Sequence, residues 1–161
     1  MKQYSERPYR PCVGICLLND EGMIFAGKRL DNRAEAWQMP QGGIDEGEDA
    51  ITACFREMEE EIGTNNAELL EEHPDWLDYD IPEPLANKLW NGTYRGQSQK
   101  WMLLRYKGSN DEINIATDIP EFEAWQWMAP ADLITLAVPF KKDVYRDLMI
   151  QFASHLGTSA S

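Results

Sequence analysis

The stretch that most limits how this chain can fold runs from residue 42 to residue 64, GGIDEGEDAITACFREMEEEIGT. A helix turns by about 100° per residue, so every third or fourth side chain returns to one face. Here that spacing gathers apolar side chains into a stripe, made of Ile51, Cys54, Phe55, Met58 and Ile62. The pattern predicts an amphipathic helix that begins near Asp49, packs against a core and ends at Gly63.

A second face of the same helix carries three carboxylates. Glu57, Glu60 and Glu61 have the i, i+3 and i+4 spacing that places side chains next to one another. Each like-charged pair costs roughly a few tenths of a kcal/mol unless a cation neutralises it. Clustered carboxylate oxygens are the ligands that hard divalent cations prefer, so the spacing points to Mg²⁺ or Mn²⁺. A solvated acidic face is the ordinary alternative for such a run of charges.

Two neighbouring features favour a site over a solvated face. Arg56 follows Glu48 by eight residues, and a charge-assisted pair between them would clamp the loop that leads into the helix. Gly42, Gly43 and Gly47 supply flexible backbone in that loop. A Gly42 carbonyl could join a metal shell there, and backbone amides could face phosphate.

These residues resemble the signature of the Nudix hydrolases, Gx5Ex7REUxEExGU, in which U is a bulky aliphatic residue. The matching positions are Gly42, Glu48, Arg56, Glu57, Met58, Glu60, Glu61 and Gly63. Thr64 departs from the pattern at the last U, a packing position that carries no chemistry. The resemblance covers 23 residues and implies a reaction class, the hydrolysis of a nucleoside diphosphate linked to another group.

Length and composition predict a single domain over residues 1–161, with a frayed tail at about 157–161. A hydrophobic content of 43% and six tryptophans indicate a folded chain. Cys12, Cys16 and Cys54 lack metal or disulfide spacing, which favours buried free thiols and a reducing cytoplasm. We expect a cytoplasmic protein without a membrane span, because no apolar run approaches ~20 residues.

The net charge of −13 argues against an extended surface that coats nucleic acid. Such a surface neutralises many phosphates with lysine and arginine. An RNA substrate should therefore be held only near one end.

Short apolar and aromatic runs predict strands around the helix. We expect hairpins from 13–18 with 23–26 and from 89–94 with 99–106, a weak strand at 68–70, and strands at 113–117 and 125–128. Prolines predict a loop over 74–84 and the start of a short helix at Pro130. The last helix is expected over 140–156, with inward-facing Val144, Leu148, Phe152 and either Met149 or Ile150. This order is compatible with an α/β fold.

Further blocks narrow the resemblance to the bacterial RNA pyrophosphohydrolases and the closely similar dinucleoside polyphosphate hydrolases. The blocks lie at residues 9–14, 37–43, 97–101, 112–114, 120–125 and 140–145. The resemblance implies a Nudix-type α/β/α sandwich with a mixed sheet. Because both activities share these blocks, the blocks do not separate them.

The resemblance also implies roles for particular residues. It assigns metal binding, with one glutamate as a possible base, to Glu57, Glu60, Glu61 and Glu121, and contact with phosphates or first bases to Arg10, Arg29, Val138, Phe140 and Lys141. Glu48 and Arg56 are expected to be structural near the site. Surface salt bridges and core packing are the ordinary alternatives for the proposed binders. His73 and His155 have no partner pattern that suggests ligation.

The predicted function is a Mg²⁺-dependent RNA 5′-pyrophosphohydrolase, with Mn²⁺ as a substitute metal, that converts 5′-triphosphate RNA to 5′-monophosphate RNA and pyrophosphate and so initiates RNA decay. Hydrolysis of a dinucleoside polyphosphate, such as diadenosine tetraphosphate to ATP and AMP, is the alternative reaction. A catalytically silent nucleotide-binding module is the alternative from another class. Such modules typically lose signature carboxylates, and this chain retains all of them.

Overall fold

The computed structural model describes residues 2–30 and 36–157. Its strands are β1 (Tyr9–Leu18), β2 (Ile24–Arg29), β3 (Trp37–Gln38), β4 (Gln41–Gly43), β5 (Ala67–Asp80), β6 (Gly96–Tyr106) and β7 (Phe122–Met128). Its helices are α1 (Ala50–Ile62), α2 (Glu83–Ala86), α3 (Pro130–Leu136) and α4 (Lys142–Gln151). Short 3₁₀ turns include η2 (Leu89–Gly92) and η4 (Pro139–Lys141).

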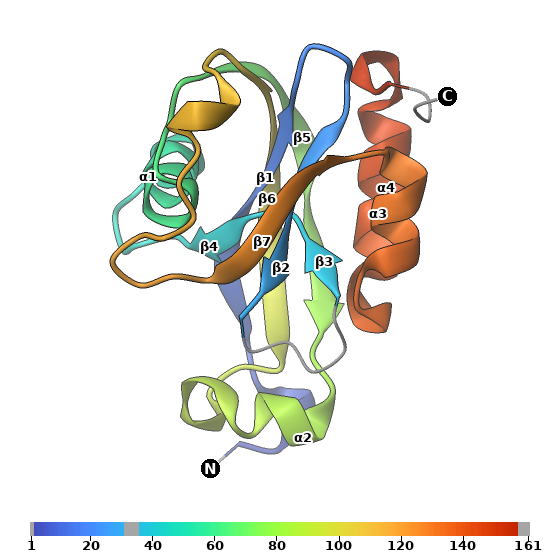
Figure 1. Cartoon of the computed structure of the whole chain (residues 1–161). Coiled ribbons are helices and arrows are strands. Elements are labelled where there is room, and N and C mark those ends of the chain that lie inside the picture. The colour runs from blue at the N-terminus through green and yellow to red at the C-terminus, as the bar shows by residue number, and fades with distance from the viewer. Residues whose placement is uncertain (1, 31–35, 158–161) are drawn as a thin grey trace.

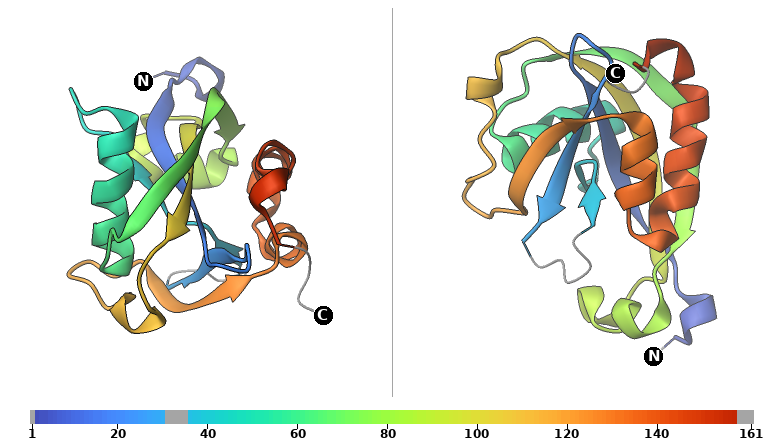
Figure 2. Two further views of the ribbon diagram at one scale, coloured as in Figure 1. Left: turned by 90° about the horizontal axis from the view of Figure 1, so that it is seen from above. Right: turned by 45° about the vertical axis from the view of Figure 1, so that its right-hand side comes forward.

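The strands form one mixed sheet in the order β3-β2-β1-β6-β5, with β4 paired to β1 and β7 paired to β2. β1 runs parallel to β6, and the other pairs are antiparallel. Helix α1 covers one face of the sheet, while α3 and α4 cover the other (Figures 1 and 2). The expected α/β sandwich with a mixed sheet is therefore confirmed.

The central strand β1 explains why the molecule has two cores. Successive side chains of a strand point to opposite faces. Val13 and Ile15 accordingly join the core under α1, whereas Cys16 and Leu18 join the core under α3 and α4. Because both faces are covered, β1 is an almost continuous apolar run.

Helix α1 begins and ends as its sequence predicts. The Asp49 side chain accepts a hydrogen bond from the Thr52 backbone amide and caps the start, and Gly63 ends the helix in the left-handed conformation, with φ 78°. Cys54, Met58 and Ile62 are buried as expected. Ile51 is a correction, because 40% of its surface is exposed while Ala53 takes the inward position.

The prediction for residues 67–106 was wrong in two places. The expected loop over 74–84 belongs largely to β5, where Pro74 lies in a break of register between Glu72 and Trp76. An edge strand tolerates proline at such an irregularity because no ladder hydrogen bond is lost. The expected strand at 89–94 contains the turn η2 instead. Gly96 to Ser98, which the expected hairpin placed between its two strands, are the first residues of β6.

The remaining elements agree in part. The first hairpin pairs Leu18 with Ile24, and β7 and α3 lie where strands and a helix were expected. Residues 113–117 form no strand, and the last helix is shorter, with η4 before it. Val144, Leu148 and Phe152 face inward, whereas Ile150 is 79% exposed. Residues 158–161 of the expected tail lie outside the described residues.

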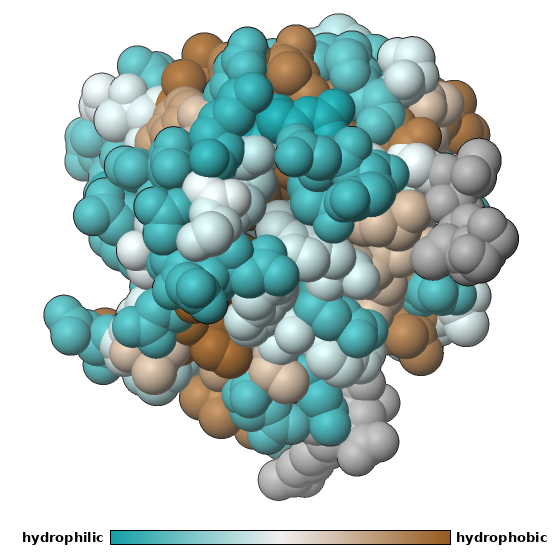
Figure 3. Space-filling view, turned by 45° about the horizontal axis from the view of Figure 1, so that its top comes forward, coloured by the Kyte–Doolittle hydropathy of each residue, from teal (hydrophilic) through white to brown (hydrophobic). Residues whose placement is uncertain are grey.

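The surface is mostly polar on the face shown, and the cysteines lie inside the molecule. Most of the face in Figure 3 is hydrophilic, with its hydrophobic side chains in separate patches. Cys12, Cys16 and Cys54 are buried and free, as predicted. No helix in residues 2–30 or 36–157 is long and apolar enough to cross a membrane.

Candidate active site

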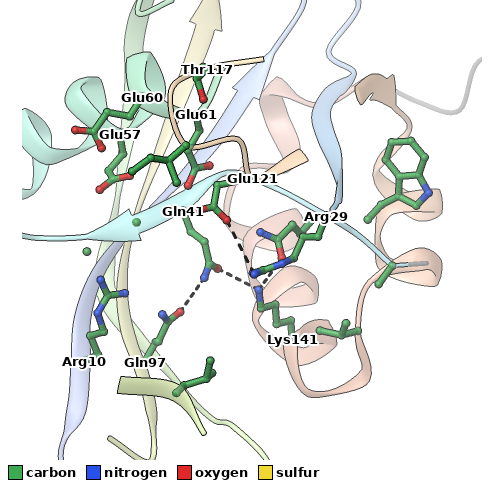
Figure 4. Close-up of a pocket in the computed structure, with 18 of the residues that line it drawn as sticks. Arg10, Arg29, Gln41, Glu57, Glu60, Glu61, Gln97, Thr117, Glu121 and Lys141 are labelled. Atoms are coloured by element: carbon green, nitrogen blue, oxygen red, sulfur yellow. Dashed lines mark hydrogen bonds and ion pairs between the residues drawn. The ribbon is translucent and has the colours of Figure 1, made fainter. Parts of the chain in front are cut away.

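A cleft of about 1190 Å³ gathers all the residues that the sequence analysis assigned to metal or substrate. Those residues are Arg10, Arg29, Gly42, Glu57, Glu60, Glu61, Glu121, Val138, Phe140 and Lys141. One part, here the acidic end, contains Glu57, Glu60, Glu61 and Glu121. The other part, here the basic end, contains Arg10, Arg29 and Lys141 together with Gln41 and Gln97 (Figure 4). The charges of the cleft are thus divided along its length.

The centre of the acidic end is a buried carboxylate. Glu61 has 8% of its surface exposed, and its Oε2 atom has no hydrogen-bond partner among the described residues. Burial raises the pKa of Glu61 well above its usual value, and the charges of Glu57 and Glu121 raise it further. Burial also raises the pKa of Glu57. Three carboxylates therefore lie near enough to repel one another.

The three carboxylates of α1 differ in their partners and in their exposure to solvent. Arg56 Nη1 lies 2.9 Å from Glu57 Oε1 and 3.2 Å from Glu60 Oε2, and the Glu60 side chain is 58% exposed. Over the described ranges, no three carboxylate, imidazole or thiol groups are arranged as a finished metal site. The expected convergence of Glu57, Glu60 and Glu61 is therefore incomplete, because Arg56 pairs with two of them.

The donors of the acidic end nevertheless fit a divalent cation. The orphaned Glu61 Oε2 is a buried oxygen that needs a partner, and carboxylate oxygens suit Mg²⁺ or Mn²⁺. Gly42 leaves room for the Glu57 carboxylate, since a Cβ at that position would lie 2.0 Å from Glu57 Cδ. The metal-binding roles of Gly42, Glu57, Glu60, Glu61 and Glu121 stay predictions.

Arg56 also braces the loop before α1. Its Nε and Nη2 atoms donate to Glu48 Oε2 at 2.8 Å and Oε1 at 2.9 Å, and Nη2 donates to the Gly43 carbonyl at 2.9 Å. The hydrogen bonds from Arg56, and then the Asp45 amide, lower the pKa of Glu48 to about 2. The ion pair that the spacing of Glu48 and Arg56 predicts is present, and it holds β4, which ends at Gly43, beside α1.

Lys141 is an unusual cation because it is buried, with 6% of its surface exposed. Its Nζ donates to Gln38 Oε1 at 3.0 Å and to Gln41 Oε1 at 3.3 Å. Burial lowers the pKa of Lys141 to about 7, and the charge of Arg29 contributes in the same direction. An anionic ligand in the cleft would favour the protonated form.

A network of amides connects Lys141 to the centre of the sheet. Trp101 Nε1 donates to Gln99 Oε1 at 3.1 Å, and Gln99 Nε2 donates to Gln41 Oε1 at 2.9 Å. Tryptophan and lysine side chains can only donate hydrogen bonds. Trp101 at one end of this network and Lys141 at the other therefore both require the oxygen of Gln41, Oε1, to be the acceptor. Gln41 Nε2 then donates to Gln97 Oε1 at 2.9 Å. The orientation of each amide is fixed by its neighbours.

Gln97 lies at the end of this network. Its Oε1 accepts hydrogen bonds from Gln41, from Gln99 at 3.2 Å and from the Tyr79 hydroxyl at 2.5 Å. Its Nε2 donates to no other residue in the described part of the chain, and Gln97 lines the cleft. Arg10 is its register partner in β1 and also lines the cleft. The network thus leaves one amide group available to a ligand.

The other predicted binders lie around this end. Arg29 Nη2 is 4.0 Å from Glu121 Oε2, which joins the basic end to the acidic end. The Phe140 ring stacks on Tyr79 with a centroid distance of 5.8 Å. Val138 precedes η4 and lines the cleft beside Phe140 and Lys141. Whether these residues contact a substrate stays a prediction.

Five further residues line the cleft although the sequence patterns assign them no role in the site: Gln41, Gln97, Tyr79, Trp90 and Thr117. The alternation of Gln97, Gln99 and Trp101 in a strand would have indicated one shared face. The hairpin expected from 89–94 with 99–106 hides that signal, because it places residues 96–98 between its two strands.

Comparison with known proteins adds a family and close relatives. The family profile described as NUDIX domain matches residues 8–148. A protein named RNA pyrophosphohydrolase from Roseobacter denitrificans is 51% identical over 157 residues, covering 96% of this chain and 98% of that protein. A protein of the same name from Rhodospirillum rubrum is 54% identical over 146 residues, covering 91% of this chain and 88% of that protein.

Solved structures with the same fold are more distant. The E. coli dihydroneopterin triphosphate pyrophosphohydrolase has a TM-score of 0.69 at 18% identity, covering 90% of this chain and 99% of that chain. A binary complex of a C. elegans Ap4A hydrolase has a TM-score of 0.62 at 19% identity, covering 89% of this chain and 98% of that chain. At these identities the likeness concerns the fold alone.

Proposed function

The chain belongs to the Nudix family of hydrolases, which act on phosphoanhydride bonds, and from this premise we propose that it removes pyrophosphate from the 5′ end of triphosphorylated RNA. The products are 5′-monophosphate RNA and pyrophosphate, and this step initiates RNA decay. The observation that carries the proposal is the close identity, over nearly the whole chain, to relatives named RNA pyrophosphohydrolase.

The charge division of the cleft supports this substrate. A 5′-triphosphate carries several negative charges next to a nucleoside, so it needs cations for the phosphates and polar or aromatic surfaces for the base. Arg10, Arg29, Lys141 and Phe140 supply those surfaces at the basic end. The net charge of −13 for the whole chain disfavours contact with the rest of a long RNA.

Mg²⁺ is the proposed metal, with Mn²⁺ as a substitute, held by Glu57, Glu61, Glu121 and the more exposed Glu60. When bound, such ions neutralise phosphate oxygens and lower the pKa of a water molecule. The family is generally dependent on divalent metals, and the orphaned Glu61 Oε2 supports a cation at this position.

The side chains of the protein have separate tasks in this proposal. Arg56 and Glu48 hold β4 against α1, so the carboxylates keep their positions. Arg29 and Lys141 bind phosphate oxygens, which draws the triphosphate toward the carboxylates. A glutamate of the acidic end accepts the proton of the attacking water. No covalent intermediate with the protein is required.

A cytoplasmic location is part of the proposal. Three buried free thiols support it, because reducing compartments keep such thiols from forming disulfides.

Product analysis tests the proposal. The parent protein and the Glu60→Gln variant are incubated with Mg²⁺ and a short 5′-triphosphate RNA, and the released phosphates are separated. We expect pyrophosphate and 5′-monophosphate RNA from the parent, and no turnover from Glu60→Gln. A parent that binds nucleotide but cleaves neither RNA nor diadenosine tetraphosphate would instead be a silent binding module.

A further inference from the structure

The turn η2 holds a bulky residue in a conformation that bulky residues rarely adopt. Trp90 has φ 47° and ψ 38°, and Asn91 has φ 57° and ψ 29°. In this left-handed region the Cβ of an L-residue crowds the following carbonyl, a cost that asparagine tolerates better than tryptophan. Backbone strain of this kind persists where the surroundings fix it, so the placement of the Trp90 side chain needs an explanation.

The Trp90 ring lies against Arg10 at the basic end of the cleft. The Arg10 Cζ atom is 4.9 Å from the centroid of the ring, a cation–π contact. The ring of Tyr94 meets Trp90 edge to face, with a centroid distance of 5.7 Å and an angle of 80°. Trp90 is therefore held by one aromatic neighbour while it contacts the guanidinium.

Gly43 limits the position of Arg10 at another point. A Cβ on Gly43 would lie 2.3 Å from Arg10 Nη2 and 3.0 Å from Arg10 Cζ. Gly43 is fixed in β4 by its pairing with Cys12. The guanidinium is thus confined by the glycine backbone and by the indole ring.

The segment that carries Trp90 is tied to the rest of the molecule. Arg7 Nη2 donates to Asn87 Oδ1 at 2.7 Å. The Arg95 amide donates to the Pro8 carbonyl at 3.1 Å, and the Ile81 amide donates to the Arg95 carbonyl at 2.8 Å. These hydrogen bonds attach both ends of the α2–η2 segment to neighbouring parts of the chain, so the backbone that carries Trp90 is held in place.

Among the described residues, Arg10 forms no ion pair with a carboxylate at contact distance, although its charge acts on Glu57, and its polar contact is Cys12 Sγ at 3.5 Å from Nη1. A guanidinium stays charged at every physiological pH and has a long side chain that loses freedom when it binds. Holding it in advance removes part of that cost from ligand binding.

We propose that Trp90 is a positioning residue, which with Gly43 fixes the Arg10 guanidinium in the cleft as a preformed contact for the terminal nucleotide of the substrate. The inference rests on the proposed function for the identity of that substrate. It concerns binding, so its signature is a change in KM with little change in kcat.

A double-mutant cycle tests whether Trp90 acts through Arg10. We expect Trp90→Leu to raise KM about fivefold to tenfold with kcat within about twofold, in line with a partly buried cation–π contact. In an Arg10→Met background, Trp90→Leu should change KM by less than about twofold. That difference is a coupling of about 1 kcal/mol. Effects that multiply in the double variant, or an unchanged KM in Trp90→Leu, would overturn the proposal.

Matched variants separate positioning from folding. Trp90→Phe keeps a ring face and should recover most of the parent KM. Trp76→Leu removes a tryptophan that is 49% exposed on β5 and does not line the cleft, and should leave KM unchanged. Gly43→Ala pushes a Cβ onto Arg10 Nη2 and should raise KM only while Arg10 is present. It replaces Trp90→Leu in the cycle if that variant does not fold, as judged by its melting temperature.

The choice of ligand separates this inference from the proposed function. If the parent cleaves diadenosine tetraphosphate but not RNA, the proposed function fails and the cycle is measured with the dinucleotide. If the parent cleaves neither, the cycle is measured on the Kd of ATP by calorimetry. The same coupling between Trp90 and Arg10 supports the inference in each case. A parent that binds no nucleotide would contradict both.

Discussion

The two ends of the cleft are built in different ways. At the acidic end, Glu57 and Glu61 come from successive turns of one helix, and Arg56 of that helix braces the loop before it. The basic end gathers Arg10, Gln41, Gln97 and Lys141 from β1, β4, β6 and η4, which are distant in the sequence. A local motif thus supplies most of the proposed chemistry, with Glu121 added from the residue before β7, and the sheet assembles the proposed recognition surface.

This difference has a kinetic consequence. Substitutions at the acidic end should lower kcat, because its carboxylates act on the reacting group. Substitutions at the basic end should raise KM, because its donors bind the parts of the substrate that do not react. Glu61→Gln and Gln97→Glu test that division.

After Glu60→Gln, which should abolish turnover, the largest effect is expected for Glu61→Gln. The change preserves shape and removes the charge of the buried oxygen donor, so kcat should fall about a thousandfold while KM stays within about threefold. Steady-state kinetics with Mg²⁺ measures both constants. Glu46→Gln, an exposed change in the loop before the same helix at a residue that does not line the cleft, is the control and should leave kcat unchanged. A large rise in KM with normal kcat for Glu61→Gln would break the division.

The next effect is expected for Gln97→Glu. The retained Oε1 still accepts from Gln41, Gln99 and Tyr79, so the network and the fold should persist. The available Nε2 becomes an oxygen, which repels phosphate, and KM should rise about tenfold or more. Tyr79→Phe removes one of the three donors and should change KM by less than about threefold. Equal effects of these two variants would show that Gln97 acts only through the network.

A smaller effect is expected on the stability that the Glu48–Arg56 pair gives to the loop beside the acidic end. Hydrogen bonds from Arg56 and then from the Asp45 amide lower the pKa of Glu48 to about 2 from 4.5, so they add stability above pH 4.5 that is lost as the pH falls toward 2. Arg56→Met removes the hydrogen bonds, and the difference in melting temperature between parent and variant should shrink between pH 6 and about pH 2.5. Thermal unfolding across this range measures it. A constant difference would mean that Glu48 is not the responsible group.

At the basic end, we expect a substitution to stabilise the protein, whereas Arg56→Met at the acidic end should destabilise it. The expected shift in melting temperature is a few degrees. Burial lowers the pKa of Lys141 from 10.5 to about 7, so protonated Lys141 opposes folding below pH 7, and this cost disappears as the pH rises toward 10.5. Lys141→Met should therefore be more stable than the parent at pH 6, with a difference that declines by pH 10. Its KM should rise. A variant less stable than the parent at pH 6 would contradict the cost assigned to this buried cation.

The same contrast explains how much could be predicted. The bounds of α1, its end at Gly63 and the Glu48–Arg56 pair follow from spacing within one segment. The first hairpin, β7 and α3 were also expected from short local patterns. The failures fall where tertiary pairing decides the structure. Pro74 suggested a loop, yet β5 continues through a register break at the sheet edge.

The basic end was predicted residue by residue only through the family resemblance. Arg10, Arg29, Val138, Phe140 and Lys141 have no spacing that marks them as neighbours, and the parallel pairing of β1 with β6 aligns Arg10 with Gln97. The burial of Lys141 and the turn at Trp90 depend on elements that pack against them from elsewhere in the chain. Patterns along the sequence carry no signal for either.

The most direct test of the account is kcat/KM, with Mg²⁺, for a short 5′-triphosphate RNA and for diadenosine tetraphosphate under identical conditions. If the basic end holds an RNA terminus for the carboxylates, the value for RNA should exceed the value for the dinucleotide by about tenfold or more, a difference of about 1.4 kcal/mol in transition-state binding. A preference for diadenosine tetraphosphate would contradict the account and assign the same arginines and Lys141 to a second adenosine.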